Sequence, residues 1–276
     1  MSARNEGLMT VINRGFGAVF KNFPLAFLAV AAYSFIDALL FQSILSFTDA
    51  SSFSEIMSMR AEEKNSVLIK VILGSSGLGL MKSIFLGPLL AATIVYIGKS
   101  HVSGKQASMY GAVNFALSRY SRLFLPYMLA QVSIQVGMII VIPGVMFLMQ
   151  YAFVDSVACL EDEKYVISRS KKLTRGRRRS LFLLILPWAI GTQVIGLLAF
   201  GESSNLFSLT LAHMLIESVY FVMYLCFFML YDQRIRLLEE LRAERKKQQE
   251  GSGAEEASAG SEQEESSAEE ASAGQE

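Results

Sequence analysis

The chain has 276 residues, of which 52% are hydrophobic and only 18% are charged. Soluble domains average about 25% charged residues, so this composition excludes an ordinary soluble domain and favours a protein that lies in a lipid bilayer. The formal net charge of zero hides an asymmetry, because the last 27 residues contain nine Glu and no Lys or Arg, which leaves residues 1–249 at +9.

Residues 1–23 predict an amphipathic helix at the membrane surface. Apolar residues recur there at helical spacing, namely Met9, Ile12, Phe16, Val19 and Phe20. The same pattern precedes a later apolar run, at Met109, Val113, Leu117 and Tyr120, and a weaker copy covers Tyr165–Leu173. We therefore expect several interfacial helices between the membrane spans.

Five apolar runs are long enough to cross a bilayer. A hydrocarbon core of ~30 Å needs about 20 helical residues. The run over 123–160 is nearly twice that length, and Ile-Pro-Gly at 142–144 favours a turn in its middle. The sequence thus predicts an all-α polytopic membrane protein with about six transmembrane helices, at residues 24–47, 79–98, 123–140, 143–160, 181–200 and 207–231.

The distribution of Lys and Arg predicts the orientation, because basic residues in short loops stay on the cytoplasmic side. With the N-terminus inside, four cytoplasmic segments hold 21 of the 25 basic residues; these segments are 1–22, 99–122, 161–180 and 232–276. Only Arg60, Lys64, Lys70 and Lys82 lie elsewhere. We expect a multi-pass protein of the inner membrane with both termini in the cytoplasm.

The C-terminal part differs in composition from the membrane domain over 24–240. Residues 241–276 are first charged and then acidic, and from Glu250 onward they contain no aromatic or β-branched residue. Such a segment buries too little apolar surface to fold alone, so a disordered cytoplasmic tail is expected. It is interpreted as a solvated tail or, alternatively, as an acidic arm that competes with anionic lipid for the basic loops.

The densest charge cluster lies beside the fifth expected span. It comprises Arg169, Lys171, Lys172, Arg175, Arg177, Arg178 and Arg179. Each basic residue near an anionic leaflet contributes about 1 kcal/mol of binding free energy, so this basic cluster is a candidate site for lipid headgroups. It is alternatively a topology signal only. Nucleic acid is not expected as a partner, because the loop lacks interleaved aromatic residues.

Polar side chains inside the spans form a second candidate site. Asp37, Gln135, Gln193 and Glu217 fall at similar mid-membrane depth, and His213 lies one helical turn from Glu217. Lys82 is discounted, because near the outer end of its expected span it can extend to the headgroups. Asp155 lies within two turns of the cytoplasmic end. The group is read as interhelical hydrogen bonding, or as a polar cavity for a proton, an ion or a lipid headgroup.

Three segments resemble a known family. They are the Ile-Pro-Gly turn, the stretch Val166-Ile-Ser-Arg-Ser-Lys-Lys-Leu-Thr-Arg-Gly176 and the closing Tyr231-Asp-Gln-Arg-Ile-Arg236. With the order of spans, they are similar to the bacterial membrane domain that precedes the catalytic part of some glycerophosphoryl diester phosphodiesterases and also occurs alone. The resemblance covers residues 1 to about 240 and implies a six-helix membrane domain without assigned chemistry. No catalytic barrel follows it in this sequence.

Motifs for catalysis or metal binding are missing from the sequence, so neither an enzyme nor a cofactor or metal site is expected. We expect a non-catalytic integral membrane protein that organises or senses the bilayer and contacts anionic lipid through its cytoplasmic basic segments. The alternative is a small transporter or channel that uses the polar residues at mid-membrane depth. No protein partner is indicated.

Overall fold

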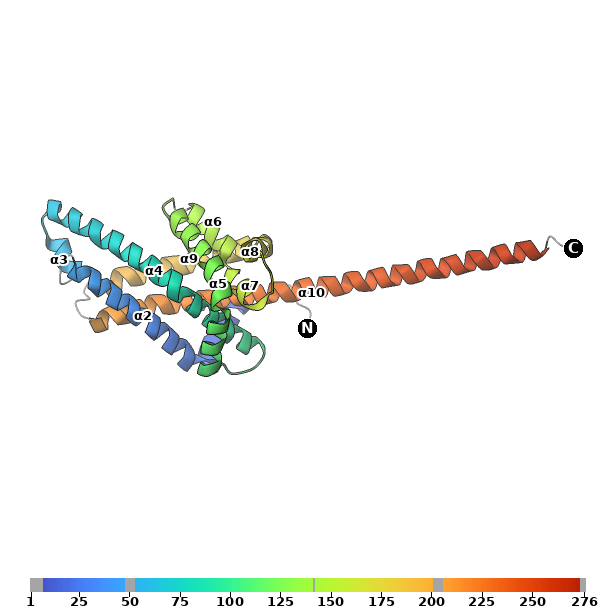
Figure 1. Cartoon of the computed structure of the whole chain (residues 1–276), viewed down its shortest axis with the longest axis horizontal. Coiled ribbons are helices and arrows are strands. Elements are labelled where there is room, and N and C mark those ends of the chain that lie inside the picture. Colours follow the sequence, from blue (N-terminus) through green and yellow to red (C-terminus); the bar gives the residue numbers. More distant parts are fainter. Residues whose placement is uncertain (1–6, 48–52, 141, 201–205, 274–276) are drawn as a thin grey trace. The chain divides into compact units, whose positions relative to one another are not determined.

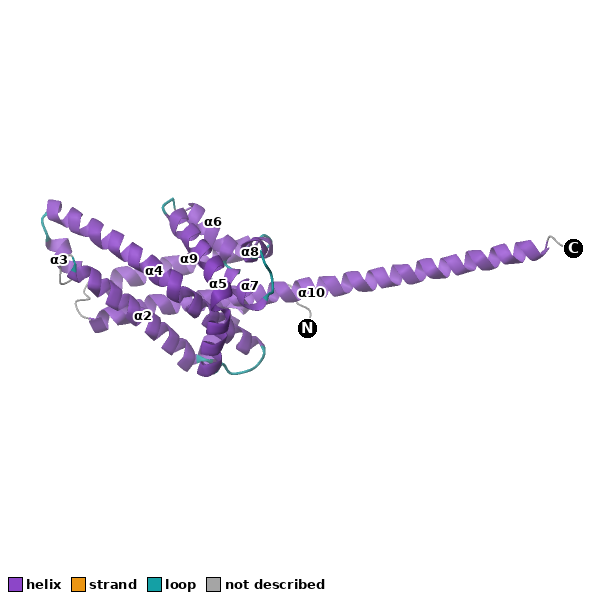
Figure 2. Cartoon of the chain, viewed as in Figure 1, coloured by secondary structure: helices purple, strands orange, loops and turns teal. Residues whose placement is uncertain are grey.

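The computed structural model describes residues 7–47, 53–140, 142–200 and 206–273, and every regular element within these ranges is an α-helix (Figure 2). The helices in chain order are α1 (Leu8–Lys21), α2 (Phe23–Ser46), α3 (Phe53–Ser58), α4 (Ala61–Val102), α5 (Met109–Met138), α6 (Ile142–Tyr151), α7 (Val154–Leu160), α8 (Val166–Thr174), α9 (Arg178–Phe200) and α10 (Leu206–Ala273) (Figure 1). The predicted all-helical class is confirmed.

The described chain divides into two units. Residues 7–231 form a compact helical unit, which we call the body, and the part of α10 from Asp232 onward belongs to the second unit. In the second unit Arg236 forms an ion pair with Asp232 at 2.8 Å, one helical turn away. All sites described below lie within the body.

Residue Asn22 fixes the corner between α1 and α2. Its side-chain amide donates to the carbonyl of Ala18 at 2.9 Å, and its side-chain oxygen accepts from the backbone N–H of Ala107 at 2.8 Å. The helix that follows carries Pro24 in its first turn, where proline is tolerated because its missing N–H would have no helical partner. The α1–α2 corner is therefore joined to the link between α4 and α5.

Helix α4 is longer than predicted. The sequence predicts a span over 79–98, whereas α4 runs unbroken over 42 residues from Ala61 to Val102 and includes the glycines at 74, 77 and 79. A neighbouring helix supports this stretch, since Gly74 packs against the side chain of Ile44 in α2. Helices α2 and α4 lie side by side in the body (Figure 1).

The expected hairpin over 123–160 is present with an additional break. Helix α5 ends at Met138 and α6 begins at Ile142, and Gly137 and Gly144 bring the two helices so close that neither position has room for a Cβ. The predicted span 143–160 is divided, because α6 ends at Tyr151 and α7 begins at Val154. The surface helix expected around 109–120 is the first part of α5, not a separate element.

Four helical segments of the described chain are long and apolar enough to cross a membrane, namely Phe23–Ser46, Gly77–Val102, Ile142–Leu160 and Leu206–Lys246. The protein is therefore a multi-pass membrane protein by the character of its helices. The expected count of about six is not confirmed. The two other predicted spans, 123–140 and 181–200, fall on α5 and α9; residue 141 and the side chains of 193 and 195–200 lie outside the described part.

Segments far apart in the sequence meet at one end of the body. The hydroxyl of Tyr231 donates to the carboxylate of Glu161 at 2.9 Å, and a Cβ at Gly98 would overlap the ring of Phe228. With the Asn22–Ala107 hydrogen bond, these contacts bring together the ends of α1, α4, α7 and of the body's part of α10. We call this the basic end, because all four segments with most of the Lys and Arg begin or end there.

The expected disordered tail differs from the structure, in which α10 continues to Ala273. Ala and Glu, which dominate the sequence after Glu250, are among the strongest helix formers, so local propensity extends the helix where tertiary packing is not required. The prediction of a disordered tail rests on the lack of apolar side chains for tertiary packing and does not include helix propensity.

Candidate functional site

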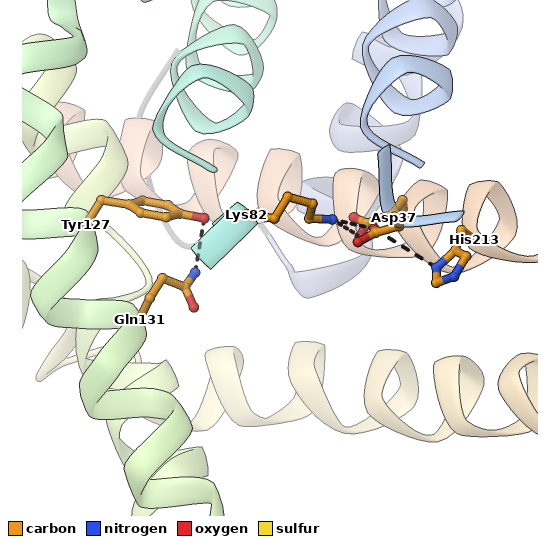
Figure 3. Close-up of polar contacts among 6 residues, drawn as sticks. Asp37, Lys82, Tyr127, Gln131 and His213 are labelled. Carbon is orange, nitrogen blue, oxygen red and sulfur yellow. Dashed lines mark hydrogen bonds and ion pairs between the residues drawn. The ribbon is translucent and has the colours of Figure 1, made fainter. Parts of the chain in front are cut away.

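An ion pair between α2 and α4 lies in the interior of the body. The Nζ of Lys82 contacts Oδ2 of Asp37, and the two side chains are only 5% and 15% exposed (Figure 3). Both residues lie in the middle of long apolar helices. Charges this far from water require a partner, because an isolated charge in an apolar medium carries a large desolvation cost.

Helix α10 supplies two further ionisable groups to this pair. Oε1 of Glu217 lies 3.7 Å from Nζ of Lys82, and Nδ1 of His213 lies 4.0 Å from Oδ2 of Asp37. The aromatic ring of Tyr33 completes the surroundings, with its centroid 3.5 Å from the Lys82 ammonium, which is the geometry of a cation–π contact. We call Tyr33, Asp37, Lys82, His213 and Glu217 the interior cluster.

The structure brings together three of the five residues predicted at mid-membrane depth, namely Asp37, His213 and Glu217. Gln135 is exposed on α5 and lies apart from them. The side chain of Gln193 lies outside the described residues.

The sequence predicts that Lys82 extends to the headgroups, and the structure contradicts this, because its side chain is buried and paired with Asp37. That prediction takes residue 79 as the start of a short span. Because α4 begins at Ala61, the same residue lies near the middle of the helix. The three residues lie at similar depth when depth is measured from the ends of the predicted spans at residues 24, 98 and 231. Asp37, Lys82 and Glu217 are about 20 to 25 Å from these ends along the helix axis.

A second polar group lies on the other side of α4. Nε2 of Gln131 donates to the hydroxyl of Tyr127 at 3.1 Å, and in Figure 3 this hydroxyl points toward α4. Tyr127 and Gln131 border a small cavity together with Asp155 of α7 and Tyr224 of α10. Its volume of about 20 Å³ is sufficient for one water molecule.

At the basic end, Glu161 joins three helices. Its carboxylate accepts from Nε of Arg169 at 2.7 Å and from the hydroxyl of Tyr231, and its carbonyl accepts from Arg122. Arg122 also pairs with Asp162 at 2.6 Å, and this hydrogen bond holds the pKa of Asp162 below its usual range. Arg169, predicted to contact lipid, is thus engaged inside the protein.

The remaining members of the basic cluster lie on α8, on the turn that follows it and on the first residues of α9. Helix α8 buries Val166, Ser170, Leu173 and Thr174 on one side, and its charged side chains lie on the opposite side. The exposed cations are Lys171, Lys172, Arg175, Arg178 and Arg179, whereas Arg177 is half-buried. The ammonium of Lys171 lies 5.3 Å from the ring centroid of Tyr151. Five of the seven predicted residues therefore present charge outward.

Within the described ranges, no three His, Cys, Asp or Glu side chains are grouped so that they could hold a metal ion. The interior cluster holds two carboxylates and one imidazole, and the Lys82 ammonium lies against both carboxylates. Protons can exchange within this arrangement, because the ammonium, the imidazole and both carboxylates lie within about 4 Å of a neighbouring member.

No family model matches the chain, and neither a curated protein nor a solved structure matches it. The resemblance to the phosphodiesterase-associated membrane domain therefore stays a prediction.

Proposed function

We propose that this protein is a non-catalytic integral membrane protein that binds anionic lipid through its cytoplasmic surface and so organises or senses the bilayer. The observation that carries this proposal is the outward display of Lys171, Lys172, Arg175, Arg178 and Arg179 beside helices with exposed apolar residues. On α5, Met109, Val113 and Leu117 are 58%, 50% and 63% exposed at a spacing of one helical turn. Apolar contact with acyl chains and cations near phosphates are the two terms that hold a protein on an anionic leaflet.

The proposed topology has six spans with both termini in the cytoplasm. Contacts at the basic end support it, because Glu161 hydrogen-bonds to Tyr231, and residue 231 follows the last apolar run. Two residues in contact lie on the same side of a hydrocarbon core that is ~30 Å thick. The apolar part of α10 crosses between residues 161 and 231, so α9 is proposed to cross as well. Arg122 donates to the Glu161 carbonyl, and the apolar segment Ile142–Leu160 lies between these two residues, so α5 is proposed to cross by the same argument.

The test compares lipid binding by two triple variants of the full-length protein in detergent micelles. Neutralising Lys172, Arg178 and Arg179 to Gln should weaken binding of phosphatidylglycerol by about a hundredfold. This follows because each cation contributes roughly 1 kcal/mol of binding free energy. The matched control neutralises Arg60, Lys64 and Lys70 to Gln, which is the same charge change far from the basic end. Native mass spectrometry counts the bound lipid. Equal retention by both variants would contradict the proposal.

A second candidate function, a small transporter or channel, is favoured by the ion-paired interior cluster. Intramembrane ionisable residues commonly mark ion pathways. Uptake or flux in proteoliposomes that disappears in Asp37→Asn or Glu217→Gln would support it. Preserved cellular phenotypes in these two variants, together with their loss on neutralising the basic cluster, would support lipid binding instead.

A further inference from the structure

The interior cluster has an unbalanced charge. Two carboxylates, Asp37 and Glu217, face a single ammonium, that of Lys82, and with both carboxylates ionised the set would carry one excess negative charge in an apolar interior. Uncompensated charge is expensive there, and two carboxylates that share one site favour a shared proton. His213 lies beside Asp37 and is a further proton acceptor.

We propose that Asp37, Glu217 and His213 hold one exchangeable proton, and that a row of hydroxyl groups connects this proton with Asp155 on the other side of α4. This proposal goes beyond lipid binding at the basic end and does not depend on it. The ligand it assigns to the interior cluster is a proton.

A metal cation fits the site less well than a proton. The Lys82 ammonium lies against both carboxylates and over the ring of Tyr33, so it fills the position that a cation would take between the acidic groups. A bound cation also needs several oxygen ligands at once. A proton needs only one oxygen or nitrogen atom and no coordination shell.

The connecting hydroxyls come from three helices. The ring of Tyr33 lies under Lys82, and the hydroxyl of Ser83 in α4 is near the hydroxyls of both Tyr33 and Tyr127. Tyr127 then accepts from Gln131, and both border the cavity that also touches Asp155. The row therefore leads from the interior cluster, past α4, to α7.

Proton movement along this row needs no other reaction. Each hydroxyl oxygen binds an arriving proton while its own proton passes to the next oxygen, so one O–H bond forms for each that breaks. A water molecule in the 20 Å³ cavity completes the contact with Asp155. The ionisable groups that face this route are Tyr33 and Asp37 from α2, Lys82 from α4, Tyr127 from α5, Asp155 from α7, and His213, Glu217 and Tyr224 from α10.

Infrared spectroscopy of the full-length protein tests both parts of the proposal. The protein is reconstituted in phosphatidylcholine–phosphatidylglycerol vesicles at neutral pH and moved from H₂O to D₂O. We expect a protonated-carboxyl band that shifts in D₂O and that is lost in Glu217→Gln or in Asp37→Asn. Absence of such a band from the unmodified protein, or its full retention in both variants, would overturn the proton site.

The rate of the same shift tests the route. Tyr127→Phe keeps the ring and removes the hydroxyl, and it should slow the shift of the cluster's band by about tenfold, as expected for one lost hydrogen bond in the path. Tyr120→Phe is the matched control, because it removes a hydroxyl from the same helix that donates to the Phe85 carbonyl instead. An equal rate in the two variants would overturn the route. Size-exclusion chromatography verifies that each variant is folded.

Discussion

At the scale of single residues, Lys82 compensates part of the negative charge of the interior cluster. Replacing it with Met leaves Asp37 and Glu217 together without their cation. Removing one partner of a buried pair typically costs about 3–5 kcal/mol, because the remaining charge is left uncompensated. We expect Lys82→Met to lower the melting temperature in detergent strongly, as measured by differential scanning fluorimetry.

The exposed Lys70 on the same helix provides the control, since Lys70→Met removes an equal charge from the surface. It should change the melting temperature little. Combining Lys82→Met with Asp37→Asn and Glu217→Gln removes all three charges and should recover much of the loss. A triple variant as unstable as Lys82→Met alone would indicate that the lysine acts through packing rather than charge.

Asp162 gives a prediction for the dependence of stability on pH. Arg122 lowers the pKa of this exposed carboxyl, so the folded protein holds the charged form more strongly than the unfolded chain does. The stabilisation is therefore complete above the unfolded pKa of about 3.9 and is lost as the pH falls through the lower folded pKa. The difference in melting temperature between the unmodified protein and Asp162→Asn should disappear on acidification. Glu163→Gln, the neighbouring exposed carboxyl, is the control.

Three residues of the interior cluster could be predicted from sequence, because a polar residue within an apolar run is visible without a structure. Lys82 could not be placed correctly, since its depth depends on where α4 begins. The hydrogen bonds around Glu161 could not be predicted from the sequence either. Its partners Arg122, Arg169 and Tyr231 are separated by up to 109 positions, and each looks like an ordinary residue next to a span. Tertiary contact between such distant residues leaves no local pattern in the sequence.

At the scale of elements, glycine marks where helices touch. A Cβ at Gly98 in α4 would overlap the ring of Phe228 in α10, whereas one at Gly77 in the same helix would meet open space. Gly98→Ala should therefore destabilise the protein by roughly 1–3 kcal/mol through overpacking. Gly77→Ala should be neutral or stabilise by up to about 1 kcal/mol, because alanine favours the helix. Thermal unfolding in one detergent compares the two, and equal effects would contradict close packing of α4 on α10.

The break between α5 and α6 could be predicted only approximately, because Ile-Pro-Gly at 142–144, where the sequence predicts the turn, forms the first turn of α6. Proline is tolerated at the start of a helix, so it marks the nearby break without forming the turn itself. The break between α6 and α7 has no such signal, since Ala152 and Phe153 interrupt the helix without a proline or glycine. Phe153 is fully buried there and packs edge-on against Tyr231, with ring centroids 5.9 Å apart. The break thus accompanies the burial of the Phe153 ring against α10. A contact with a helix so distant in sequence cannot be predicted from the periodicity of a single segment.

At the scale of the whole molecule, the number of spans determines the side of the membrane on which the basic cluster lies. With six spans, residues 161–180 share the cytoplasmic side with the link between α4 and α5. If α5 and α9 did not cross, the same residues would lie outside while both termini stayed inside. The positive-inside rule favours six, since residues 161–180 hold eight of the 25 basic residues.

Cysteine labelling distinguishes the two arrangements. Lys172→Cys, Lys105→Cys and Arg60→Cys place single thiols at exposed positions, while Cys159 and Cys226 are buried and should stay unlabelled. In intact spheroplasts an impermeant maleimide should label Arg60→Cys only, and the other two should react after permeabilisation. Labelling of Lys172→Cys from outside would indicate four spans. It would also require that Glu161 and Tyr231 lie on opposite sides of the hydrocarbon core, which their 2.9 Å hydrogen bond does not allow.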